Sequence, residues 1–152
     1  MRISARFVHT NVIAQDWRAL AKFYQEVFGC IPVPPERDFK GGSLDAATGL
    51  VGAHLTGLHL RLPGSPEASP TLEIFHYDVL ETRPPIAVNR PGYGHIAFSV
   101  DDVPSARDAV LQAGGSPVGE IVTLQTSDGR KVTWCYVADP EGNLLELQSW
   151  SP

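Results

Sequence analysis

The chain has 152 residues, 43% of them apolar, and a formal net charge of −5, which suits one compact domain or two closely joined half-domains with a hydrophobic core. The negative charge and the scattered arginines exclude a basic nucleic-acid surface, and no apolar run approaches the roughly 20 residues of a membrane span. The first residues lack the apolar segment of a signal peptide and the two cysteines form no disulfide framework, so we expect a cytoplasmic protein without nucleic-acid or membrane partners.

The first elements are predicted by residue alternation and helical spacing. Residues 5–13 alternate in character, which predicts a half-buried strand. Asp16 is a suitable N-cap for a helix over residues 17–28, where large apolar residues recur three and four positions apart. Residues 31–35 then predict a short edge strand limited by prolines, and the charged, glycine-rich stretch 36–50 predicts a long mobile loop beside a site.

Two strands complete the first half of the chain. The first covers residues 54–62, and Gly57 within it predicts a bulge. Prolines and glycine over residues 63–70 predict a turn, and the second strand follows at residues 71–77. We therefore expect this half to build one sheet with a single packed helix.

A proline-rich linker separates the two halves. We place module one at residues 5–80, the linker at residues 81–92 and module two at residues 93–150, because Pro84, Pro85 and Pro91 disfavour regular structure between them. The elements predicted for module two are a strand at 93–100, a helix at 103–113 and strands at 118–124, 131–138 and 144–150.

The second half repeats the first. His95 and Asp102 stand in module two where His9 and Asp16 stand in module one, each histidine on an opening strand and each aspartate before a helix. Each module therefore has the order βαβββ. The prediction is an α+β protein with eight strands and two helices.

Two motifs of module two resemble signatures of a known family. They are Gly94-His95-Ile96-Ala97-Phe98 and Asp139-Pro140-Glu141-Gly142-Asn143-Leu144-Leu145-Glu146-Leu147. With the paired βαβββ modules, they resemble the vicinal oxygen chelate superfamily, also called the glyoxalase/bleomycin resistance protein/dioxygenase family, and glyoxalase I in particular. The resemblance implies two tandem modules that form a curled mixed sheet around a shared cleft holding a divalent metal.

The same resemblance implies a ligand set. Carried over residue by residue, the metal ligands of the glyoxalase I pattern fall on His9, Glu73, His95 and Glu146, and the ion would be Zn, Ni, Co, Mn or Fe. Strand alternation agrees, because these four side chains belong to the polar face of each predicted strand and the opposite faces are almost wholly apolar. Two imidazoles and two carboxylates leave about two open positions on an octahedral ion for a chelating substrate.

The remaining histidines are expected to be structural or exposed. His54, His59 and His76 have no counterpart in the other module, and His76 lies on the strand face opposite Glu73. Cys30 and Cys135 are interpreted as inert small residues.

The function implied is that of a metal-dependent lyase or isomerase related to lactoylglutathione lyase. The ion would polarise a carbonyl, and Glu146, or as second choice Glu73, would transfer the proton of the adjacent carbon. The resemblance also leaves an acyl-CoA epimerase and an extradiol dioxygenase open, the latter less favoured because its iron is held within one module by two histidines and one glutamate.

A binding or resistance protein without chemistry is the alternative from another class. It would use an aromatic substrate pocket made by Phe75, Tyr77, Trp134, Tyr136 and Trp150. In either class the partner is a small molecule, and family members commonly form homodimers, so a homodimer is expected.

Overall fold

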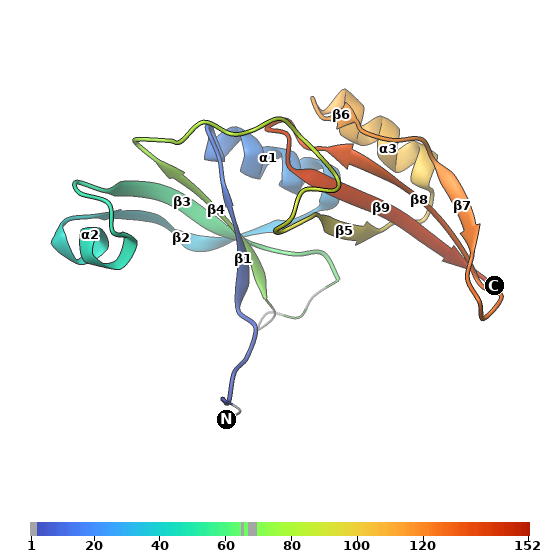
Figure 1. Ribbon diagram of the computed structural model, residues 1–152, viewed down its shortest axis with the longest axis horizontal. Coiled ribbons are helices and arrows are strands. Elements are labelled where there is room, and N and C mark those ends of the chain that lie inside the picture. The colour runs from blue at the N-terminus through green and yellow to red at the C-terminus, as the bar shows by residue number, and fades with distance from the viewer. Residues whose placement is uncertain (1–2, 65, 67–69) are drawn as a thin grey trace. The chain divides into compact units, whose positions relative to one another are not determined.

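The computed structural model describes residues 3–64, 66 and 70–152 and divides the chain into two compact units (Figure 1). Unit one spans Met1–Thr82 and unit two spans Arg83–Pro152. Each unit has its own mixed sheet with helices, so the α+β class and the two tandem modules are confirmed. Part of the turn predicted at residues 63–70 lies outside the described residues.

Unit one forms a sheet in the order β1-β4-β3-β2, in which β1 and β4 are parallel and the other pairs antiparallel. Its elements are β1 (His9–Ile13), α1 (Trp17–Phe28), β2 (Ile31–Lys40), α2 (Gly42–Thr48), β3 (His54–Arg61) and β4 (Thr71–Tyr77). The inner strand β4 therefore has β1 on one side and β3 on the other.

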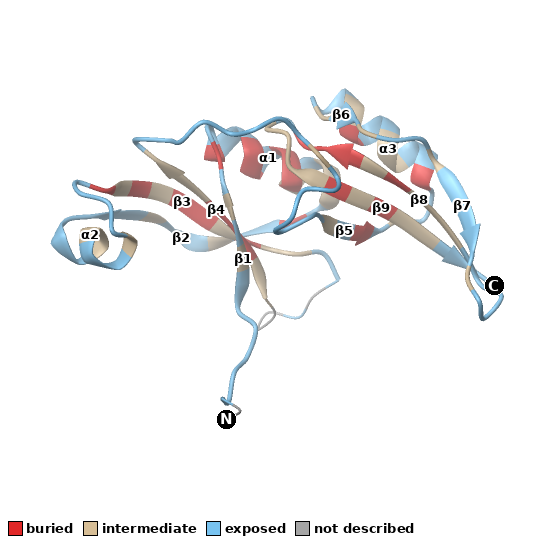
Figure 2. Ribbon diagram, in the orientation of Figure 1, coloured by how far each residue is buried: buried red, intermediate tan, exposed pale blue. Residues whose placement is uncertain are grey.

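The predicted helix α1 is confirmed from residue 17 to residue 28. The Asp16 carboxylate accepts hydrogen bonds from the backbone N–H groups of Arg18 and Ala19, which otherwise have no partner at a helix start. One face of α1 is buried and contacts β3 and β4, and Figure 2 shows the buried residues of unit one concentrated on these elements. This packing covers the apolar face of the sheet and leaves the other face for polar residues.

The prediction of a loop at residues 36–50 is wrong. The strand that was expected to stop at residue 35 continues to Lys40, and residues 42–48 form the helix α2. The pairing of β2 with β3 shifts between Val33 and Arg37 and then resumes, so the prolines interrupt the ladder without ending the strand. The Asp45 carboxylate accepts hydrogen bonds from the backbone of residues 52 and 53, which ties α2 to the start of β3.

The prediction of a bulge at Gly57 is also wrong. β3 pairs without interruption with β4, where Gly57 faces Phe75, and the irregularity lies in the neighbouring strand β2. Glycine is required at this position because a Cβ would overlap the carbonyl oxygen of Ile74 and lie 2.9 Å from Phe75 Cα. Close approach of two strands, rather than a bulge, explains this glycine.

Unit two repeats the arrangement, with β5 parallel to β9 and β8 antiparallel to β9, β6 and β7. Its elements are β5 (Ile96–Ser99), α3 (Val103–Gln112), β6 (Ser116–Pro117), β7 (Val122–Gln125), β8 (Lys131–Ala138) and β9 (Leu144–Ser151). The strand predicted at residues 118–124 is replaced by β6 and β7, and β5 begins three residues later than predicted. With α2, these changes give nine strands and three helices in the described residues, where eight and two were predicted.

The core of unit two lies between α3 and the sheet. The Asp102 carboxylate accepts a hydrogen bond from the Ser105 backbone N–H and caps α3. Val110, Leu145 and Leu147 are fully buried where α3 contacts β8 and β9 (Figure 2). None of the helices in the described residues is both long and apolar enough to cross a membrane.

Candidate metal centre

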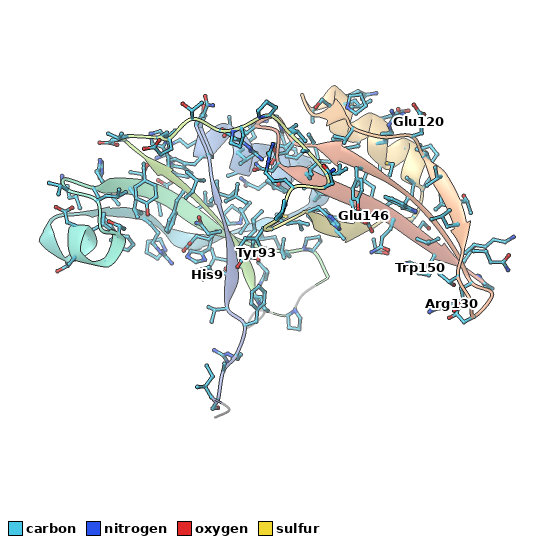
Figure 3. The ribbon with its side chains drawn as sticks, in the orientation of Figure 1. His9, Tyr93, Glu120, Arg130, Glu146 and Trp150 are labelled. Atoms are coloured by element: carbon cyan, nitrogen blue, oxygen red, sulfur yellow. The ribbon has the colours of Figure 1, made fainter. Side chains whose placement is uncertain are left out.

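The polar face of unit one is organised around Glu73 on β4. Asn11 lies opposite Glu73 on β1, and His59 lies opposite it on β3. Residues that face each other across a ladder project from the same side of a sheet, so the three side chains meet. His9, two residues before Asn11, projects from the same face of β1 (Figure 3).

These side chains form a compact polar cluster. His59 Nε2 lies 2.8 Å from Glu73 Oε1, and His9 Nε2 lies 3.6 Å from Glu73 Oε2. Asn11 Nδ2 donates a 2.8 Å hydrogen bond to Glu73 Oε2. One ligand atom from each of His9, His59 and Glu73 lies within 4.8 Å of the others, so unit one contains a His-His-Glu group that could hold a metal ion.

Burial affects both Glu73 and His59. Glu73 is only 8% exposed. Burial of a carboxylate costs free energy unless polar partners compensate it, and His59 and Asn11 provide such partners. Burial is the main cause that lowers the pKa of His59, with Arg37 and His9 adding to it, and these outweigh the opposing carboxylate. The lowered pKa favours the neutral imidazole, which is the form that binds metals.

Unit two carries a related pair. His95 Nε2 lies 3.3 Å from Glu146 Oε2, and the His95 ring lies 5.1 Å from the ring of Tyr136. Glu146 on β9 faces Ala97 on β5 and Tyr136 on β8, as Glu73 faces a residue of β1 and one of β3.

The strand register makes the two modules equivalent position by position. Glu73 faces Asn11 and Glu146 faces Ala97, and each opening histidine, His9 or His95, comes two residues before that partner, with His95 just ahead of β5. The residue equivalent to His59 is Tyr136, since each faces the glutamate from the antiparallel neighbour. Each unit thus brings its own predicted histidine and glutamate together, and the binding of one ion by all four stays a prediction.

His59 was not among the ligands predicted from the sequence. It was expected to be structural or exposed because it has no counterpart in module two. The pairing of β3 with β4 places it directly opposite Glu73, which is the signal that identifies it. His54 and His76 do make structural contacts, His54 with Asp38 and Asp78 at 2.9 Å each.

The predicted aromatic pocket residues lie on the same sheet faces as the glutamates. Trp134 and Tyr136 of unit two meet edge to face at 5.0 Å, and the Arg130 guanidinium lies 5.0 Å from the Trp150 ring (Figure 3). Phe75 of unit one lies 6.3 Å from the His59 ring, and Tyr77 faces Leu55 near the end of β4. Whether these side chains form one slot stays a prediction.

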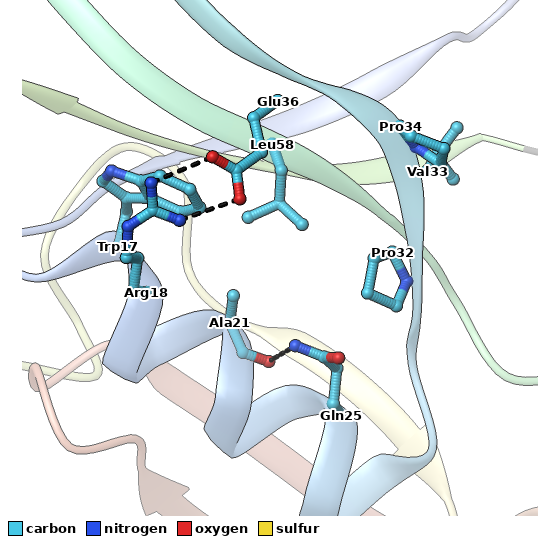
Figure 4. Close-up of a pocket in the computed structure, with 9 residues that line it drawn as sticks. All are labelled: Trp17, Arg18, Ala21, Gln25, Pro32, Val33, Pro34, Glu36 and Leu58. Carbon is cyan, nitrogen blue, oxygen red and sulfur yellow. Dashed lines mark hydrogen bonds and ion pairs between the residues drawn. The ribbon is translucent and has the colours of Figure 1, made fainter.

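A cavity of about 400 Å³ in unit one is separate from the cluster (Figure 4). It lies between α1 and β2, where Arg18 pairs with both carboxylate oxygens of Glu36 at 2.8 and 2.9 Å and stacks on Trp17. Leu58 lines it from the helix-covered face of β3, whereas its neighbour His59 projects from the other face. None of the predicted site residues lines this cavity.

Comparison with known proteins supports the resemblance. The family model described as Glyoxalase/Bleomycin resistance protein/Dioxygenase superfamily matches residues 6–147. No curated protein sequence matches the chain.

Three solved structures illustrate the likeness of fold. A glyoxalase family protein from Bacillus cereus is 19% identical with a TM-score of 0.79, over 99% of this chain and 97% of that chain. A glyoxylase/bleomycin resistance protein/dioxygenase domain from Frankia sp. is 16% identical with a TM-score of 0.63, over 98% and 100%. A glyoxalase I mutant from Zea mays is 18% identical with a TM-score of 0.63, over 93% of this chain and 45% of that chain.

Proposed function

The chain belongs to the glyoxalase/bleomycin resistance protein/dioxygenase superfamily, and we propose that it is a metal-dependent lyase or isomerase of the glyoxalase I-like type. Its ligands would be His9, Glu73, His95 and Glu146. The observation that carries the proposal is the recurrence of one histidine–glutamate pair, at 3.6 and 3.3 Å, at the equivalent position of both modules.

The donor set fits a divalent ion. Imidazole nitrogens and carboxylate oxygens bind zinc, nickel, cobalt, manganese and iron. When bound, such an ion acts as a Lewis acid that polarises a substrate carbonyl and makes the adjacent C–H bond more acidic.

The chain supplies the base, and the contacts favour Glu146 over Glu73. Glu73 is buried and held by Asn11, His59 and His9. Within the described part of unit two, Glu146 has a single ion-pair partner, His95, and it faces an alanine at the position where Glu73 faces Asn11. A carboxylate with fewer fixed partners can turn toward a substrate C–H bond, so Glu146 accepts the proton.

The His-His-Glu group of unit one favours a second candidate, an oxygen-dependent dioxygenase. Two histidines and one carboxylate that leave open positions are typical of non-haem iron oxygenases. Consumption of dioxygen by the Fe²⁺-loaded protein with catechols, in the absence of any isomerase activity, would select this candidate.

Metal analysis and a substrate screen test the proposal together. The purified chain should contain or accept one divalent ion per site and, once loaded, should convert hemithioacetals of 2-oxoaldehydes or epimerise acyl-CoA esters. The chelator-treated protein should lose this activity and regain it when Zn²⁺, Ni²⁺, Co²⁺ or Mn²⁺ is returned. A protein that binds no metal, gains no thermal stability from these ions and turns over neither class would instead be a binding module.

A further inference from the structure

We propose that His59 is a metal ligand, so that unit one alone supplies three ligands, His9, His59 and Glu73, to the ion. The inference rests on the proposed function only in requiring a bound divalent ion. It goes beyond the predicted ligand set, because it adds an imidazole from β3 of unit one.

The distances in unit one suit a shared ion. Two donors bound at about 2.1 Å in a tetrahedral arrangement lie about 3.4 Å apart, and octahedral neighbours lie about 3.0 Å apart. His9 Nε2 and Glu73 Oε2 are already at 3.6 Å. His59 Nε2 and Glu73 Oε1, at 2.8 Å, need to separate by only a few tenths of an ångström.

Two of the three proposed ligands, His59 and Glu73, have partners that orient them. His59 Nδ1 lies 2.8 Å from Thr71 Oγ1, and a hydroxyl that accepts the Nδ1–H leaves the Nε2 lone pair directed at the cluster. The Asn11 amide holds Glu73 Oε2 from the other side. Such outer partners are characteristic of histidine and carboxylate ligands at metal sites.

Comparison of the modules shows that these features belong to unit one. At the register positions of His59 and Asn11, unit two has Tyr136 and Ala97, which provide neither an imidazole nor an amide donor. The extra imidazole and the extra amide stand on either side of the same glutamate, Glu73. This asymmetry is expected if unit one is the module that holds the ion.

The test uses the full chain, freed of metal with a chelator and titrated with Co²⁺. His59→Gln keeps an amide that can donate to Glu73 but removes the imidazole. His54→Gln is the matched control, because it makes the same change on the same strand outside the cluster. The readouts are the Co²⁺ affinity and the paramagnetically shifted exchangeable N–H signals in the proton NMR spectrum, one for each bound imidazole.

His59→Gln should lower the Co²⁺ affinity at least about 10-fold and remove one shifted N–H signal, and His54→Gln should change neither. Loss of an orienting partner alone also costs about 10–100-fold in affinity, so the signal count decides. If His59→Gln retains every shifted signal, or if the wild-type chain binds no Co²⁺, the inference is overturned. If the signal is lost as expected but no loaded protein turns over any substrate, the inference stands and the proposed lyase function fails.

Discussion

Replacement of Gly57 by alanine should destabilise unit one strongly, because atoms of β4 occupy the space that a Cβ on β3 would need there. The new Cβ would overlap the Ile74 carbonyl oxygen and lie 2.9 Å from Phe75 Cα. An ordinary carbon–carbon contact is about 3.5–4.0 Å, so β4 must move by at least about 0.6 Å. Overpacking costs about 1–3 kcal/mol and a lost ladder hydrogen bond about 0.5–1.5 kcal/mol, which together give about 1.5–4.5 kcal/mol.

Thermal unfolding followed by circular dichroism measures this loss. For a domain of about 60–100 residues, 1 kcal/mol lowers Tm by about 4–8 °C, so Gly57→Ala should lower Tm by about 6–36 °C. Gly42→Ala is the control in the same unit, since its Cβ meets nothing within 4 Å and its φ is not positive. Equal melting temperatures for wild type and Gly57→Ala would refute the close approach of the two strands.

Three further predictions concern the cap, the pH dependence and the ligands. Asp16→Ala should cost about 0.5–2 kcal/mol in urea unfolding and Asp16→Asn much less, because only the alanine removes the acceptor for the first turn of α1. Hydrogen bonds to Asp78 and Asp38 raise the pKa of His54, so this group stabilises the fold below its unfolded pKa of about 6.5 and the contribution disappears as pH rises through the folded pKa. The urea midpoint should therefore fall between pH 6 and 8 more steeply in wild type than in His54→Gln, and equal slopes would contradict this. His95→Ala should weaken Co²⁺ binding less than His9→Ala does by calorimetry, because the three donors of unit one remain; a larger loss in His95→Ala would contradict it.

Elements with strong local signals were predictable from the sequence. α1 matches its prediction from residue 17 to residue 28 because a capping aspartate and a clean apolar face both mark it. β4 and β8 match theirs, residues 71–77 and 131–138, because alternation continues through each of them. In these segments local preference and tertiary packing agree.

The stretch after residue 35 was mispredicted because its pairing is not local. Prolines at positions 34 and 35 indicate the end of a strand, yet β2 is held by β3, where Phe39 faces Leu55 and Lys40 faces His54. The cost of the prolines is absorbed by the register shift before Arg37. Such a compensation depends on a partner strand and cannot be recognised in the segment itself.

The site was predictable to the extent that it repeats. The family resemblance implied His9, Glu73, His95 and Glu146, the repeat supported them because each has a counterpart, and each unit does bring its own pair together. His59 has no counterpart and was found only from the pairing of β3 with β4. Comparison of repeats therefore points to residues that the modules share and passes over residues that make one module different from the other.

Glu146→Gln tests the central claim, proton transfer by this chain beside a bound ion, most directly. The amide keeps the size of the side chain and an oxygen but removes the proton acceptor. The metal-loaded variant should bind Co²⁺ nearly as well as wild type and lose about 10²–10⁴-fold in kcat on the hemithioacetal or acyl-CoA ester that wild type converts. Full turnover by Glu146→Gln with the metal still bound would contradict the assignment of Glu146 as the base.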